Sequence, residues 1–159
     1  MDAIRAKALY LLARRDYSRW ELQQKLMQKG FDPELIEAVL QTLENENSLN
    51  ETRYIGNFIR FRQGRGMGPL KIEAQLRRQG IDEDQIRRDE AWQKVNAKER
   101  AVAVREKRFG EDLPQDFSER LSQMRFLQRR GFTHEQIRAA LNNTMHDMID
   151  ETTDTTDTI

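Results

Sequence analysis

Residues 25–40 read KLMQKGFDPELIEAVL, and the same pattern returns as QLRRQGIDEDQIRRDE at 75–90 and as FLQRRGFTHEQIRAAL at 126–141. The anchor glycines are Gly30, Gly80 and Gly131, with spacings of 50 and 51 residues. In each copy a leucine lies four residues before the glycine, an apolar residue follows it at once, and an isoleucine lies six residues after it. Agreement at so many positions predicts that the chain is an internal repeat of three similar units.

Each copy carries the signals of a helix that ends and another that begins. The glycine is suited to end a helix, because it adopts the left-handed backbone conformation without strain. A capping residue follows, and in the last two copies a glutamine three residues later completes a capping box. In the first copy, Pro33 fits the first position of the next helix. The buried stripe of that helix is predicted to be Leu35, Ile36, Val39, Leu40 and Leu43.

These signals, with no sustained period-2 alternation, predict an all-α fold. We expect an elongated tandem array of three three-helix modules, about nine helices, over residues 1–48, 49–90 and 91–143. The first helix of each module is predicted at about 3–15, 51–64 and 91–109. Residues 144–159 are predicted to be a disordered tail with five acidic residues and no Lys or Arg.

Composition excludes several classes of function. The chain has 159 residues, 34% of them charged, with a mean hydropathy of −0.88 and no cysteine. Disulfides, thiolate nucleophiles and cysteine-ligated metals are therefore excluded. The apolar run at 8–13 is too short to cross a membrane, so a soluble cytoplasmic protein is expected. With two histidines and no metal-ligand spacing, we predict no enzyme, no catalytic residues, no cofactor and no metal site.

Charge is unevenly distributed along the chain. Lys and Arg number 27 and Asp and Glu also 27, yet residues 60–110 hold 14 basic residues and 8 acidic ones. A basic body with an acidic tail indicates an anionic partner, either nucleic acid or an acidic protein surface. We hypothesise that the tail partly shields the basic body.

The stretch QGRGMGPLK at 63–71 lies within this basic region. It lacks the context of a phosphate-binding loop, since no strand precedes it and no GK[ST] or GxGxxG follows. It is predicted to join two helices, with Pro69 as the first residue of the second. A second interpretation stays open, in which the glycines let the backbone approach a phosphate or an acidic groove between flanking cations. In the helix before it, Tyr54 and Phe58 are predicted to be core, while Phe61 could be core or stack on a base.

The segment RYIGNFIRFRQGRGMGPLKIEAQLRRQGI at 53–81 resembles the central signature of the RecX regulatory proteins. Segments 17–31 and 125–141 resemble that family's first and third modules, so the resemblance covers about residues 5–141. The sequence departs from the pattern at Gly56, where alanine is usual. The matching positions are Tyr54, Phe58, Arg62, Gly66, Gly68, Pro69, Ile72, Leu76, Gly80 and Ile81.

The resemblance implies tandem three-helix modules that bind the RecA filament on single-stranded DNA. It implies inhibition of filament extension, ATP hydrolysis, strand exchange and RecA-promoted cleavage of the SOS repressor. A monomer without membrane contact is expected. Two alternatives are a helical protein that competes with RecA by binding single- or double-stranded DNA directly, and a scaffold for another acidic protein. The predicted contacts to the RecA filament or to DNA phosphate are Arg60, Arg62, Arg65, Lys71, Arg77 and Arg78.

Overall fold

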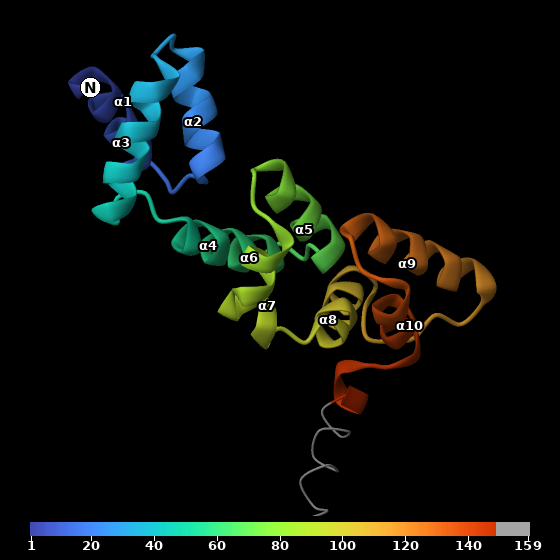
Figure 1. The fold of residues 1–159 in the computed structure, drawn as a ribbon. Coiled ribbons are helices and arrows are strands. Elements are labelled where there is room, and N and C mark those ends of the chain that lie inside the picture. Colours follow the sequence, from blue (N-terminus) through green and yellow to red (C-terminus); the bar gives the residue numbers. More distant parts are fainter. Residues whose placement is uncertain (149–159) are drawn as a thin grey trace, which may run out of the picture. The chain divides into compact units, whose positions relative to one another are not determined.

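The computed structural model describes residues 1–148, and the regular secondary structure over that range is all α-helix, with ten helices between Asp2 and Asn142 (Figure 1). The described residues divide into two compact units. Unit one contains residues 1–60 and 74–93, and unit two contains residues 61–73 and 94–148. The all-α prediction is therefore confirmed. The boundaries of the three predicted modules stay a prediction, because the two compact units divide the chain at other residues.

Unit one begins with three helices that surround a common core: α1 (Asp2–Leu12), α2 (Arg19–Gln28) and α3 (Pro33–Asn45). It also holds most of α4 (Glu51–Gly64), the end of α5 (Pro69–Arg78), α6 (Glu83–Arg88) and most of α7 (Glu90–Lys94). The core residues of its first three helices and their flanks are Ile4, Ala8, Tyr17, Leu22, Leu26, Ile36, Val39, Leu40, Leu43 and Leu49.

The prediction that Leu35 belongs to the buried stripe of α3 is wrong. Leu35 is 41% exposed, whereas the other four residues of the stripe are buried. A helix turns by about 100° per residue, so Leu35 lies to one side of the face that its neighbour Ile36 buries. The predicted first helix, at about 3–15, also ends earlier, at Leu12.

Unit two contains α8 (Ala97–Phe109), α9 (Phe117–Arg130) and α10 (His134–Asn142), which pack on one another, together with the end of α4 and the start of α5. The single helix predicted at about 91–109 is wrong, because α7 and α8 are separate. The Asn96 side chain accepts a hydrogen bond from the Glu99 backbone N–H, and this cap starts a new helix at Ala97. The core residues are Ala101, Val102, Leu127, Phe132, Ile137, Ala140, Leu141 and Met148.

The repeat is confirmed at its anchor positions. The leucines before the three glycines are fully buried, and the isoleucines after them are at most 2% exposed. The glycines themselves have φ angles of 87°, 81° and 99°, in the left-handed region that glycine tolerates. Capping boxes close at Asp82 with Gln85 and at Thr133 with Gln136. The same local chemistry therefore sets the same helix ends three times.

Residues 145–148, the first part of the predicted acidic tail, form one further helical turn, and Met148 is buried in the unit-two core. The rest of the tail lies outside the described residues. No helix among residues 1–148 is both long and apolar enough to span a membrane.

The segment after α8 is anchored by a buried arginine. Arg105 is fully buried, and its Nη1 donates to the carbonyls of Asp112 (3.0 Å) and Gly110 (3.4 Å). Burial lowers the pKa of Arg105, because the charged guanidinium loses its hydration. The Glu106 carboxylate, 3.6 Å away, opposes that effect.

We expect Arg105→Met to reduce the free energy of unfolding by about 2 kcal/mol, because the loop carbonyls lose a charged donor. Urea unfolding followed by circular dichroism measures this loss, and hydrogen exchange should become faster at residues 110–116. An unchanged or raised stability would contradict the anchoring role, since a methionine fills much the same space without the cost of burying a charge.

Candidate anion-binding pocket

The glycine-rich segment joins α4 to α5 and docks on the turn between α9 and α10. The Gly68 N–H donates to the Arg130 carbonyl (2.7 Å), and the Leu70 N–H donates to the Gly131 carbonyl (3.0 Å). A Cβ atom on Gly68 would lie 2.4 Å from the carbonyl carbon of Gly131. The prediction of a helix joint is confirmed, and the glycines allow one backbone to approach another within the same unit.

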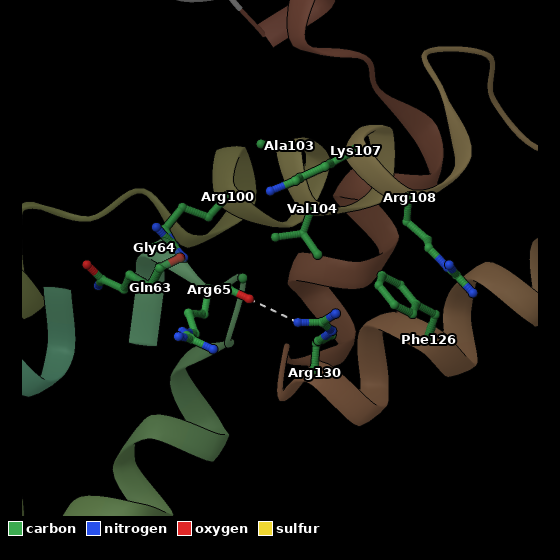
Figure 2. A pocket seen from close by; sticks show the side chains of 11 residues that line it. Gln63, Gly64, Arg65, Arg100, Ala103, Val104, Lys107, Arg108, Phe126 and Arg130 are labelled. Atoms are coloured by element: carbon green, nitrogen blue, oxygen red, sulfur yellow. Dashed lines mark hydrogen bonds between the residues drawn. The ribbon is translucent and has the colours of Figure 1, made fainter. Parts of the chain in front are cut away.

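Beside this joint, unit two contains a pocket of about 480 Å³ (Figure 2). The end of α4 and its following turn form one wall, α8 forms a second, and α9 supplies the third. The lining residues are Gln63, Gly64, Arg65, Gly66, Arg100, Ala103, Val104, Lys107, Arg108, Phe126 and Arg130.

The lining is strongly cationic. Five of the eleven lining residues are Lys or Arg, and none is acidic. Within residues 1–148, no ion pair joins any of the five to an acidic side chain. Positive charges that converge on a partly enclosed space create a focused potential that attracts anions.

Two of these arginines are held in place by the joint itself. Arg130 Nη1 donates to the Arg65 carbonyl at 2.9 Å, the dashed contact in Figure 2, and Arg100 Nη2 donates to the Gln63 carbonyl. Burial lowers the pKa of Arg100, because the pocket wall removes water from its charge. Each guanidinium has five N–H donors, so both keep donors for a ligand.

Phe126 supplies the aromatic part of the pocket. The Cζ atom of Arg130 lies 5.1 Å from the centroid of its ring, and that of Arg108 lies 5.8 Å away. Phe109 packs edge-on against the same ring at 5.3 Å. Cation–π contacts of this kind hold guanidinium groups near an aromatic ring.

A second hollow of about 470 Å³ shares three residues with the first and extends the cationic surface. Arg108, Phe126 and Arg130 line both, and the second adds Lys71 and Arg129. Lys71 lies against the α9–α10 turn, because a Cβ atom on Gly131 would come within 2.5 Å of the Lys71 Cβ.

The predicted contact residues fall into three groups. Arg65 lines the first hollow and Lys71 lines the second. Arg62 belongs to the same unit but lines neither, and its Cζ lies 5.7 Å from the Phe61 ring. Arg60, Arg77 and Arg78 are exposed residues of unit one, where Arg60 Nη2 donates to Asn57 at 2.7 Å.

Sequence reasoning missed most of the pocket. Arg100, Lys107, Arg108 and Phe126 belong to no motif, although the three basic residues among them lie in the basic region at 60–110. The pair Arg129–Arg130 offered a signal, since similar arginine pairs lie on either side of the anchor glycine Gly80. Among the aromatic residues, Tyr54 is buried as predicted, Phe58 is half-buried, and Phe61 is 55% exposed.

The pocket offers cations and one aromatic ring to a ligand. Its lining contains no histidine, hydroxyl or carboxylate that could act as a general base or a nucleophile. Residues 1–148 contain no group of three or more His, Asp or Glu side chains placed to hold a metal ion. The lining cations therefore make the pocket a candidate site for an anionic ligand.

Comparison with known proteins identifies the family. Models of the first, second and third three-helix domains of RecX match residues 5–43, 50–88 and 97–141. The chain therefore belongs to the RecX family.

Relatives carry the name Regulatory protein RecX. The protein from Halorhodospira halophila is 46% identical over 141 residues, covering 87% of this chain and 86% of that protein. The one from Pseudomonas syringae pv. tomato is 41% identical over 135 residues, covering 85% and 87%. The crystal structure of RecX from Lactobacillus salivarius has the same fold, with a TM-score of 0.76 at 20% identity over 89% of this chain and 94% of that one.

Proposed function

We propose that this protein binds the RecA filament on single-stranded DNA and inhibits its extension, its ATPase, strand exchange and cleavage of the SOS repressor. Membership of the RecX family supports the RecA partner, and the regulatory names of its relatives favour a role without catalysis. In this proposal the protein acts as a monomer in the cytoplasm.

The observation that carries the proposal is the surplus of positive charge among the described residues of unit two. Residues 61–73 and 94–148 hold 14 Lys and Arg against 9 Asp and Glu, whereas unit one holds 13 against 14. The surplus converges on the pocket and its neighbouring hollow. A nucleoprotein filament offers both DNA phosphate and acidic protein surface as ligands for such a surface.

The test is RecA ATPase on single-stranded DNA, with this protein added far below one copy per RecA. Inhibition at that ratio is expected, because a protein that blocks filament extension stops many RecA subunits at once. A lack of inhibition at any ratio would contradict the proposed function.

A direct DNA-binding protein is the second candidate, and the arginines around Phe126 favour it. Such a protein would inhibit RecA only at concentrations that occupy the DNA sites. Its affinity for DNA alone would fall steeply with salt, because each phosphate contact releases a condensed counterion.

A further inference from the structure

The pocket combines an apolar surface with converging positive charge. Val104 and Phe126 supply an apolar surface, and charge surrounds it from Arg65, Lys107 and Arg108, which have no ion pair with an acidic side chain among residues 1–148 (Figure 2). A simple anion such as phosphate would bind the positive charges but would leave the apolar surface exposed to water. The ligand that fits both parts carries a negative charge beside a flat apolar face.

A nucleotide matches this description better than an acidic peptide does. Four of the five cations are arginines, whose planar guanidinium groups both stack on bases and bind phosphate. A Glu or Asp side chain brings one charge on a short stem and has no flat face to lay against Phe126 or the arginines. A volume of about 480 Å³ lies within the range of small-molecule sites.

The second hollow supports a strand rather than a free nucleotide. Lys71 and Arg129 lie next to the pocket and share Arg108, Phe126 and Arg130 with it. In a polynucleotide, each base has a phosphate on either side, so a base in the first hollow places the next phosphate near the second. A base that is stacked and paired in a duplex cannot enter a side pocket without being extruded.

We therefore propose that the pocket is a base-binding site for single-stranded DNA. One unpaired base lies against Val104 and Phe126, and the flanking phosphates bind the surrounding arginines and lysines. This inference rests on the proposed function, because it assigns to the pocket the DNA strand of the filament.

The experiment measures binding of the full chain to a labelled 15-nucleotide oligo(dT) by fluorescence anisotropy, without RecA. The comparison ligand has the same sugar-phosphate backbone with abasic sites throughout, and therefore the same charge. We expect oligo(dT) to bind about tenfold more tightly, the value of one stacked base. Phe126→Leu should remove most of this advantage, so that oligo(dT) and the abasic strand bind with nearly equal affinity.

Phe117→Leu is the matched control, because Phe117 lies on the same helix, is 78% exposed and does not line the pocket. It should keep the preference for oligo(dT). Equal affinity for the two strands would overturn the proposal, as the site would then recognise phosphate alone. If the protein bound neither strand but bound a labelled polyglutamate peptide, the pocket would instead be assigned to an acidic protein segment.

The two proposals can fail separately. Base-dependent binding without any inhibition of RecA ATPase would remove the proposed function and leave the DNA site. Inhibition of the ATPase below one copy per RecA, with equal affinity for the dT and abasic strands, would remove the base site alone.

Discussion

Replacing Gly68 with alanine is expected to reduce the free energy of unfolding by about 3 kcal/mol or more. The added methyl group would lie 2.4 Å from the carbonyl carbon of Gly131, 2.5 Å from its oxygen and 2.6 Å from the Phe132 nitrogen. All three atoms are backbone, so no side chain can rotate away to make room. The hydrogen bonds from Gly68 and Leu70 to the α9–α10 turn would have to lengthen or break.

Gly64→Ala is the matched control for this experiment. A Cβ atom at Gly64 meets nothing within 4 Å, and this residue is the last of α4. Alanine there should be neutral or raise stability by up to about 1 kcal/mol through helix propensity. Urea unfolding of both variants, followed by circular dichroism, makes the comparison. If Gly68→Ala stayed within about 0.5 kcal/mol of the unaltered protein, the close docking of the joint would be contradicted.

Reversing two charges of the pocket, Lys107→Glu with Arg108→Glu, is expected to raise the concentration for half-inhibition of RecA ATPase about 100-fold. Two charge-assisted contacts are lost, each of about 1.5 kcal/mol, and the new carboxylates repel the ligand. Both side chains are exposed at the end of α8, so the fold should survive with a small loss of favourable helix-end charge.

The control makes the same change in charge away from the pocket. Arg125→Glu with Arg138→Glu alters two exposed arginines of α9 and α10 that line neither hollow. This pair should shift the half-inhibition concentration by no more than a few-fold, through long-range electrostatics alone. Equal losses in the two double variants would show that net charge, rather than the pocket, determines inhibition.

The local parts of the fold could be predicted from sequence because their causes are local. Capping side chains, a proline at a first helical turn and a glycine with positive φ act within a few residues, so Asp82, Thr133 and Pro33 were assigned correctly. Val95 and Asn96 show where this reasoning fails. The residues on either side of Asn96 have helical spacing, which favours one continuous helix, whereas the cap at Asn96 favours a new helix that begins there. The helical pattern alone does not show which of these two structures forms.

The pocket could not be predicted in the same way, because it depends on tertiary docking. Arg65 and Arg130 are separated by 65 positions in the chain, and no spacing rule brings them together. Arg65 and Lys71 were found through their nearness to the glycines. Lys107 and Arg108 were missed because a basic helix end looks the same whether it faces water or a pocket.

Arg130 belongs to the joint and to the pocket at once. Its carbonyl accepts the hydrogen bond from Gly68, while its guanidinium reaches the Arg65 carbonyl and the Phe126 ring. A random-mutagenesis screen for loss of binding should therefore recover changes at Gly66, Gly68 and Gly131 as well as at the cations. The positions at which mutations abolish binding would therefore include glycines, which have no side chain that could contact a ligand.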